Sequence, residues 1–184
     1  LYGTINVPDF TSSPTQYDLQ LTGNYVNNGR MMGGGVCIEG DYYALYRGNA
    51  SKRSNSERVW IFKKQTNGTF NYHQEVETHA NLTLDYFGQS VSMSGNYMAV
   101  GSGNKYSGEK GYVFVYQRND VSDTYPYYSG FKELKHPTTH SNNNGFGYSV
   151  SLYQDTLLVS SGDNKCYLYE RRSGTNNNWD LEKT

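Results

Sequence analysis

The apolar residues of this chain fall into short clusters that recur in a fixed order. The clusters at 59–62, 113–116 and 166–169 read VWIF, VFVY and CYLY, and Gly, Asn, Ser and Asp lie between successive clusters. Short runs of β-branched and aromatic residues bounded by turn residues are typical of β-strands. No segment favours a helix. The pattern predicts an all-β fold in which strand 113–116, apolar on both faces, is buried between two neighbouring sheets.

A motif at the start of each period shows that the clusters form internal repeats. The segment FGQSVS at 87–92 returns as FGYSVS at 146–151, and a diverged copy, MGGGVC, stands at 32–37. The three copies lie 55 and 59 residues apart. Each repeat of about 53–59 residues carries four apolar clusters, which indicates a four-stranded antiparallel blade, and stacked blades make a β-propeller.

The repeat also predicts where each blade begins and ends. Residues 1–22 are expected to be the end of a preceding blade, with its fourth strand and the tail of its third. Residues 23–76 are predicted to form blade 1, 77–134 blade 2, and 135–184 a blade 3 that is truncated in its last strand. Because propellers close with about four to eight blades, we expect a fragment of a larger propeller, or copies that complete one another.

Net charge and hydropathy exclude two classes of partner. The formal net charge is −1, from 16 Lys and Arg against 17 Asp and Glu, and the basic residues form no patch. Nucleic-acid binding is therefore not expected. No apolar run reaches the length that a membrane-spanning helix needs, so no membrane span is predicted in this segment.

The composition favours an extracellular protein. Nineteen Tyr and 20 Gly against 18% charged residues are typical of secreted β-rich modules. Sequons at Asn49, Asn67 and Asn81 fall in predicted loops, where a glycan could be accommodated. We therefore expect a glycoprotein that is secreted or lies at the cell surface, with these three residues as glycosylation candidates.

Few residues are candidates for catalysis or metal binding. His136 and His140 have a spacing that aligns two metal ligands only on a helix, and here they lie in a predicted loop as solvated side chains. Asp41, Asn96 and Asp155 recur at equivalent positions, which indicates hairpin turns. No catalytic, cofactor-binding or metal-binding residue is predicted.

The remaining small residues are expected to be structural. The Gly triplet at 33–35 precedes a strand and not a helix, so it indicates a bulge or a close backbone approach, not a phosphate loop. Cys37 and Cys166 hold non-equivalent positions and are expected to be unpaired and buried, as small apolar residues.

An aromatic group beside Pro126 is the best candidate for a binding loop. Tyr125, Tyr127 and Tyr128 follow the third strand of blade 2. Exposed rings could stack on sugars or anchor a protein. In the alternative interpretation the same rings cover the outer edge of their blade.

The repeated motif resembles FG-GAP repeats, the propeller repeats of integrin alpha-subunit heads and of many surface proteins. The resemblance rests on Phe87-Gly88 and Phe146-Gly147, each followed by Ser-Val-Ser, and on the strand at 111–116. It implies that these Phe and Gly residues are structural residues of the repeat. The Gly-Ala-Pro element of the family is replaced, for example by Gly101-Ser102-Gly103. The resemblance makes calcium possible, but an Asp-rich loop that could hold it is missing, so no cofactor is predicted.

Together these observations predict a non-catalytic extracellular or surface module for adhesion or recognition of a protein or glycan partner. Rigid blades would present the loops between their strands. One alternative is a structural subunit of an extracellular filament or coat, assembled through blade edges from further copies of itself. A propeller enzyme, either hydrolase or lyase, is the less favoured alternative, because the inner-strand positions carry small hydroxyls, as at Ser90 and Ser149.

Overall fold

The computed structural model describes residues 30–49, 58–77, 86–103, 111–125, 131–138, 145–172 and 177–184. These residues form twelve β-strands. The first sheet contains β1 (Arg30–Glu39), β2 (Tyr42–Asn49), β3 (Arg58–Lys64) and β4 (Phe70–Glu77). The second contains β5 (Ser90–Ser94), β6 (Tyr97–Ser102), β7 (Tyr112–Gln117) and β8 (Phe131–Lys135). The third contains β9 (Val150–Tyr153), β10 (Thr156–Ser160), β11 (Cys166–Arg171) and β12 (Trp179–Lys183).

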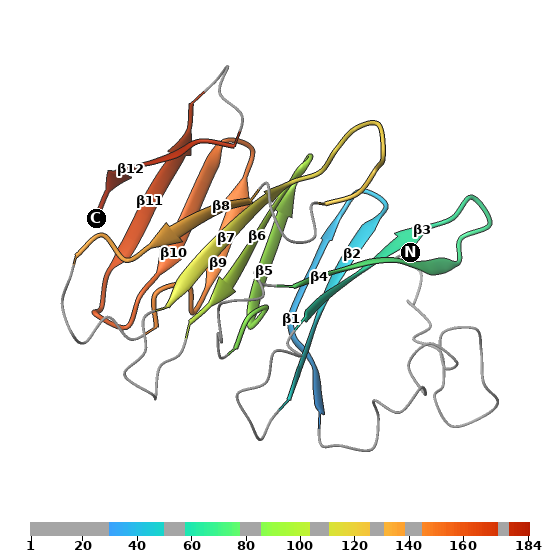
Figure 1. The fold of residues 1–184 in the computed structure, drawn as a ribbon, viewed down its shortest axis with the longest axis horizontal. Coiled ribbons are helices and arrows are strands. Elements are labelled where there is room, and N and C mark those ends of the chain that lie inside the picture. Colours follow the sequence, from blue (N-terminus) through green and yellow to red (C-terminus); the bar gives the residue numbers. More distant parts are fainter. Residues whose placement is uncertain are drawn as a thin grey trace, which may run out of the picture.

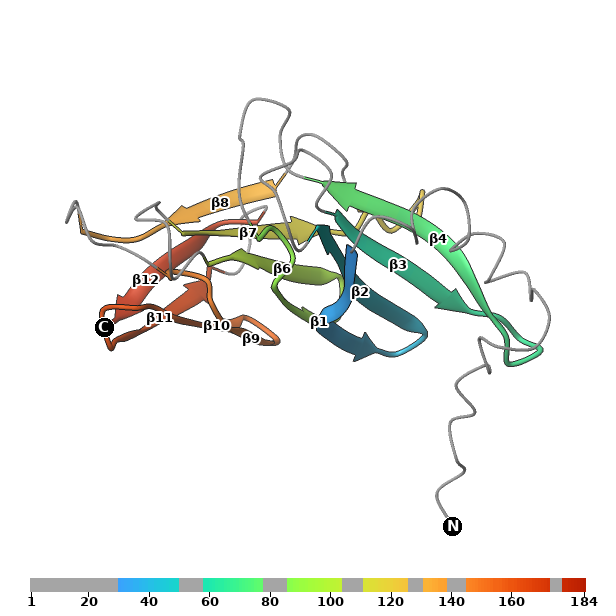
Figure 2. The ribbon, with the colours of Figure 1, turned by 90° about the horizontal axis from the view of Figure 1, so that it is seen from below.

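Each sheet is an antiparallel meander of four strands in chain order, so the sheets are blade 1 (β1–β4), blade 2 (β5–β8) and blade 3 (β9–β12). The blades stand side by side in Figure 1. The first strand of blade 2 packs against the first strands of both neighbours, and in Figure 2 β1 and β9 lie on the side of the molecule opposite β4 and β8. The prediction of an all-β fold built from four-stranded propeller blades is confirmed; the residues that the structure describes show no closed ring.

The hairpin between the first two strands closes in the same way in every blade. The turn residues Gly40 and Gly95 have φ of +56°, and Gln154 has φ of +51°. One further hydrogen bond extends each hairpin to the third strand: the carbonyls of Asp41, Asn96 and Asp155 accept the backbone N–H groups of Lys64, Arg118 and Arg171 at 2.8, 2.7 and 2.8 Å. The predicted hairpin turns at Asp41, Asn96 and Asp155 are therefore confirmed.

Blade 2 is buried on both of its faces. Val100, Phe114 and Tyr116 belong to an apolar cluster shared with blade 1, whereas Val113 and Val115 belong to a second cluster shared with blade 3. The five side chains are fully buried. This double burial explains why both faces of the β7 sequence are apolar, because a blade between two others has no solvent-facing side.

The Gly triplet at the start of β1 behaves as predicted. The register of the β1–β2 pair shifts between Met32 and Val36. A Cβ on Gly35 would lie 2.4 Å from the carbonyl oxygen of Gly88 in blade 2, so the two backbones approach too closely for a side chain. Both the bulge and the close approach are present, and a strand follows, not a helix.

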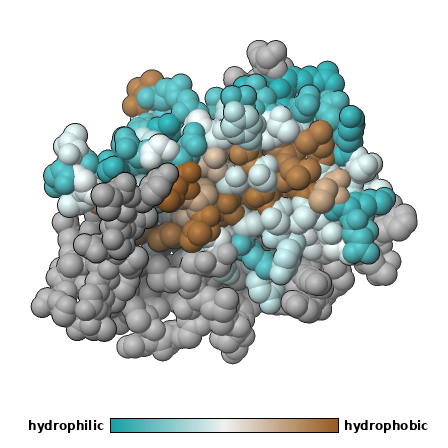
Figure 3. Space-filling view, turned by 180° about the vertical axis from the view of Figure 1, so that it is seen from behind, coloured by the Kyte–Doolittle hydropathy of each residue, from teal (hydrophilic) through white to brown (hydrophobic). Residues whose placement is uncertain are grey.

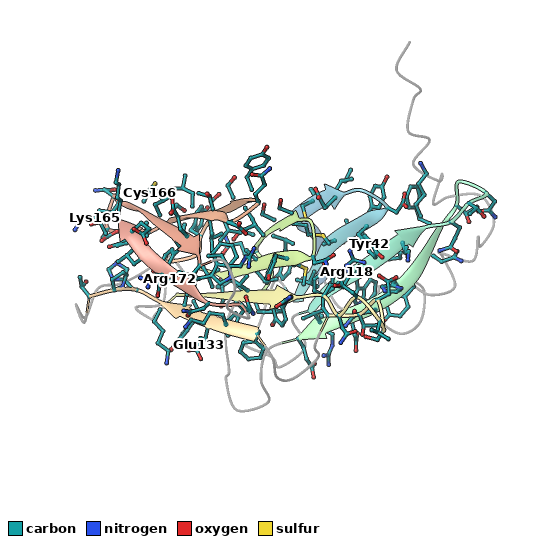
Figure 4. The ribbon with its side chains drawn as sticks, turned by 90° about the horizontal axis from the view of Figure 1, so that it is seen from above. Tyr42, Arg118, Glu133, Lys165, Cys166 and Arg172 are labelled. Carbon is teal, nitrogen blue, oxygen red and sulfur yellow. The ribbon has the colours of Figure 1, made fainter. Side chains whose placement is uncertain are left out.

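The two cysteines differ from each other in exposure. Both are free thiols; Cys37 is half-buried and Cys166 is exposed. The expectation that both are buried is therefore wrong for Cys166, which lies on the side of blade 3 that faces away from blade 2 (Figure 4). The equivalent residues of the other blades, Val59 and Val113, are buried because another blade covers them.

Candidate functional site

The Phe-Gly turns fasten each blade to the one before it. Phe87 and Phe146 are fully buried, and Gly88 and Gly147 have φ of +91° and +84°. A Cβ on Gly88 would lie 2.7 Å from the Tyr46 ring, and one on Gly147 would lie 2.4 Å from the carbonyl oxygen of Tyr112. Both contacts are with the preceding blade. Only glycine fits, because the backbone is left-handed and the neighbouring blade fills the space of a side chain.

Hydrogen bonds between inner strands join the blades on the same side. At the second junction, between blades 2 and 3, the Ser90 hydroxyl donates to the carbonyl of Gly147 at 2.8 Å. The Ser92 and Ser94 hydroxyls accept the backbone N–H groups of Leu152 at 2.9 Å and Gln154 at 2.8 Å. The small inner-strand hydroxyls are thus structural links between blades.

At the first junction, between blades 1 and 2, Cys37 and Glu39 hold the positions of Ser92 and Ser94. The Cys37 thiol bonds to the backbone of Met93, and Glu39 Oε1 accepts the backbone N–H of Gly95 at 2.8 Å. Burial raises the pKa of the Cys37 thiol to about 12. This cysteine is therefore a structural hydrogen-bonding group and a poor nucleophile.

An arginine from each later blade stacks on a tyrosine of the blade before it. The Arg118 guanidinium lies 4.2 Å from the ring centre of Tyr42, and that of Arg171 lies 4.8 Å from that of Tyr97. Figure 4 shows Tyr42 and Arg118 close together between blades 1 and 2. Each pair holds equivalent positions, so this cation–π contact is a repeated feature of the junctions.

A charged cluster centred on Asp123 strengthens the first junction. The Asp123 carboxylate accepts hydrogen bonds from Tyr42, Lys63 and Arg118, and its carbonyl contacts His73 Nε2 at 2.6 Å. Partial burial raises the pKa of the Asp123 carboxyl, but the bonds from Lys63, Tyr42 and Arg118 outweigh it and hold the pKa well below its usual range. The carboxylate therefore stays ionised and ties the β7–β8 connection to blade 1.

Tyr125 lies in the same connection and is 2% exposed. The Gln74 side chain holds its backbone in both directions, accepting the Tyr125 N–H at 2.8 Å and donating to the Tyr125 carbonyl at 2.6 Å. Burial beside blade 1 removes Tyr125 from the predicted exposed binding cluster, and it packs in the first junction, whereas the alternative interpretation had it cover the outer edge of its own blade. The other two residues of that cluster, Tyr127 and Tyr128, lie outside the described residues.

The corresponding part of the second junction is neutral. The Asn177 side chain, in the β11–β12 connection, donates to the carbonyl of Val115 at 2.7 Å. The Trp179 indole N–H donates to Asn177 Oδ1 at 2.9 Å, and the indole packs edge-on against Tyr97 with ring centres 5.9 Å apart. A polar amide and an aromatic ring here fasten blade 3 to blade 2.

The His136 side chain is buried, so its prediction as a solvated side chain is wrong. Its side chain is 3% exposed, and its Nε2 lies 3.2 Å from Asp163 Oδ2 and 2.9 Å from the Tyr167 hydroxyl. The ring packs edge-on against Phe146 with centres 5.6 Å apart. His140 lies outside the described residues. The sequence alone could not show this cluster, because it joins residues about 30 positions apart.

A groove lies at the hairpin ends of the blades, lined by described residues of all three. It has a volume of 510 Å³, and its lining includes Glu39, Asn96, Tyr97, Tyr153 and Asp155. Tyr153 is 70% exposed. The two carboxylates already have partners, since Glu39 accepts Gly95 N–H at 2.8 Å and Asp155 accepts Arg171 Nε–H at 2.8 Å. The groove therefore offers an aromatic ring and the Gln154 amide more than free acid–base groups.

A second groove, of 400 Å³, follows the first strands of the blades. It is lined by Gly35, Gln89, Ser90, Tyr148, Ser149 and neighbouring Val residues. The rear face of the molecule carries a stripe of apolar residues (Figure 3). On β1, the apolar side chains of Val36 and Ile38 are 59% and 58% exposed.

The three sequons fall in different settings. Asn67 lies in the exposed β3–β4 turn, where its Oδ1 accepts the backbone N–H of Thr69 at 3.0 Å and the Thr69 hydroxyl at 2.7 Å. Asn49 is the last residue of β2 and pairs with Arg30, so the predicted loop placement is wrong for Asn49. Asn81 lies outside the described residues, as do most of the loops expected to carry binding.

The described residues contain neither a candidate metal site nor a candidate membrane-spanning helix. In the ranges that the structure describes, no group of three or more His, Cys, Asp and Glu side chains could hold a metal ion. In the same ranges no helix has the length and apolar character to cross a membrane.

One comparison with known proteins gives a match. Residues 81–116 match the family model described as FG-GAP repeat. No curated protein and no solved structure matches the chain. The matched segment contains the turn at Phe87-Gly88, which inserts between blades 1 and 2, and the strands β5 and β6. The resemblance carried by this motif is confirmed there, and residues 81–116 of this chain are an FG-GAP repeat.

Proposed function

We propose that this chain is a non-catalytic recognition module of an extracellular or surface protein, and that the groove at its hairpin ends binds a glycan. FG-GAP repeats typically form non-catalytic binding modules, which supports the first part. The exposed sequon at Asn67, whose amide already bonds to the Thr69 hydroxyl, supports the extracellular location.

The observation that carries the glycan proposal is the exposed ring of Tyr153, which lines the groove. Tyr153 is 70% exposed, whereas Tyr97, in the same groove, is partly covered by Arg171. Large aromatic faces bind sugar rings with little loss of side-chain entropy, and convergent amides orient the hydroxyls. Gln154 supplies such an amide, whereas the Asn96 amide is already bonded to Asp120 and Arg118. Rigid hairpin turns hold all of these groups, so little order has to be gained on binding.

The charges of the groove support binding over catalysis. Glycoside hydrolysis needs a pair of carboxyl groups free to act as acid and base or nucleophile. Glu39 and Asp155 each hold a structural partner, a backbone N–H and a guanidinium. Their hydrogen bonds fix the turns of blade 2 and the end of β11.

A glycan array read with the fluorescently labelled chain tests the proposal. We expect wild type to bind a defined glycan class and Tyr153→Ala to lose at least about tenfold in affinity, the equivalent of about 1.4 kcal/mol. Tyr72→Ala is the matched control, because Tyr72 is 40% exposed on β4, outside the lining of the groove. Absence of binding by wild type, or equal binding by the Tyr153 variant, would contradict the proposal. Binding of a protein at the groove would also contradict it, because the ligand would then be a protein and not a glycan.

A further inference from the structure

We propose that two copies of this chain associate head to tail, with blade 1 of one copy docked on the outward face of blade 3 of the other. The contact would repeat the two junctions that already exist inside the chain. This inference goes beyond the proposed recognition function and does not depend on it.

The outward face of blade 3 matches faces that are covered elsewhere in the chain. In blade 1 the face toward blade 2 consists of Ala44, Val59 and Ile61, all fully buried under Phe87, Val91 and Met93. In blade 2 the equivalent residues are Ala99, Val113 and Val115, fully buried under Phe146, Val150 and Leu152. In blade 3 the equivalent residues are Leu158, Cys166 and Leu168. Leu158 is 43% exposed, Cys166 is exposed and Leu168 is half-buried.

Blade 1 presents the complementary surface. Val91 and Met93 of β5 are 8% and 6% exposed, because they pack on blade 1. Val36 and Ile38 hold the same positions in β1 and are 59% and 58% exposed. Two neighbouring apolar side chains on a first strand are therefore left uncovered, although the repeat uses the same positions to join blades.

The polar groups of the junction are repeated as well. Ser90 and Ser92 bond to the backbone of the following blade. Their equivalents in blade 3, Ser149 and Ser151, are exposed. A first strand that arrives from another copy would find these hydroxyls in the positions that β5 offers to β9.

A second copy fits this surface because the same chain carries both halves of the contact. The interface is heterologous, since the two partners use different faces, and it extends to rings or filaments. The stacking of an arginine on a tyrosine would be missing from this contact. Blade 3 has Thr156 at the position that Tyr42 and Tyr97 hold in the other blades. We therefore expect association that is weaker than the internal junctions and depends on concentration.

Size-exclusion chromatography with light scattering over a concentration series tests the proposal on the full chain. Wild type is expected to exceed the 20.9 kDa monomer mass as its concentration rises. Ile38→Lys places a charge on the blade 1 surface that would dock, and Leu158→Lys places one on the blade 3 face that would receive it. Both side chains are already partly in solvent, so we expect each variant to keep the fold. Each variant alone is expected to be a monomer.

Mixing the two variants gives the sharper result. Ile38→Lys keeps an intact blade 3 face and Leu158→Lys keeps an intact blade 1 face, so an equimolar mixture should form a dimer of twice the monomer mass and stop there. Val121→Lys is the control, because Val121 is 97% exposed in the β7–β8 connection and should associate as wild type does. Neither Ile38 nor Leu158 lines the groove, so both variants should keep the glycan binding of wild type.

A wild-type chain that stays monomeric throughout the concentration series would overturn the proposal, as would a mixture that remains monomeric while wild type associates.

Discussion

The two internal junctions share one frame but differ in what fastens their outer part. Both have a buried Phe-Gly turn, hydrogen bonds between first strands, and an arginine stacked on a tyrosine. The first junction adds a charged cluster around Asp123, whereas the second adds the neutral pair Asn177 and Trp179. The repeat thus specifies how blades stack, and the connection before the fourth strand supplies a fastening that is particular to each junction.

This difference gives the two junctions different responses to their surroundings. An ion pair that is partly open to solvent weakens with salt and with protonation of its carboxylate. An amide and a carbonyl group do not titrate in the folded or the unfolded state, so the hydrogen bond between them does not change with pH. The outer fastening of the first junction should therefore depend on pH, and that of the second should not.

Gly147→Ala should have the largest effect on stability. It breaks, at the second junction, the Phe-Gly turn that both junctions contain. An alanine at φ of +84° would place its Cβ 2.4 Å from the Tyr112 carbonyl oxygen, so blade 3 would have to move away from blade 2. We expect a loss of about 3–5 kcal/mol in the free energy of unfolding. Gly40→Ala is the control: its φ is also positive, but a Cβ there meets no atom within 4 Å, and it should cost about 1 kcal/mol. Urea denaturation measures both, and equal losses would contradict the close approach.

Asp123→Asn should break the charged fastening of the first junction. Removing the charge leaves Lys63 and Arg118 without their shared carboxylate, and we expect a loss of about 1–2 kcal/mol near pH 7, reduced by solvent screening. Because the folded-state pKa of Asp123 is lowered, its contribution is complete above the unfolded value of about 3.9 and is lost as the pH falls through the folded value. The difference in Tm between wild type and variant should therefore shrink below about pH 4. A difference that is constant from pH 7 to pH 3 would argue against this role.

Asn177→Ala should weaken the second junction by about 1 kcal/mol, because Val115 loses a hydrogen-bond donor and Trp179 loses its acceptor. The loss should not change with pH between 3 and 7, since neither group titrates. Thermal unfolding at the same pH values as for Asp123→Asn makes the comparison direct. A pH-dependent loss here would remove the contrast between the junctions.

Alkylation of the two thiols should have the smallest effect on stability and still report on the junctions. Iodoacetamide at pH 8 should modify Cys166, which is exposed, and leave Cys37 unmodified, since its pKa is raised to about 12 at the first junction. Mass spectrometry of the intact and digested chain identifies the modified residue. In denaturant both thiols should react, which controls for reagent access.

Repetition in the sequence is sufficient to predict the arrangement of strands. Each blade is a meander of neighbouring strands joined by hairpins, so the Phe-Gly spacing, the apolar clusters and the recurring Asp or Asn at the first turn depend on residues close in sequence. The bulge at the Gly triplet follows from the same local logic, because three successive residues without side chains allow a close approach of backbones.

The sequence misplaced residues whose surroundings come from another blade or from a distant loop. Tyr125 is buried because Gln74, 51 positions away, holds its backbone, and His136 is buried because Asp163 and Tyr167 fold over it. Cys166 is exposed because no described residue covers blade 3 as blades 2 and 3 cover Val59 and Val113. Composition and spacing along the chain do not predict these contacts, because the contacting residues are far apart in the sequence.

The sequence by itself therefore determined the strands, their order and the Phe-Gly points at which blades join, since these depend on short-range hydrogen bonding and on a repeated apolar pattern. Only the tertiary structure decided which polar groups meet at each junction, which aromatic residues face solvent, and which blade faces are left open. Those outcomes depend on packing between segments that are about 30 or more residues apart, where one loop conformation decides whether a side chain is buried or reaches the solvent.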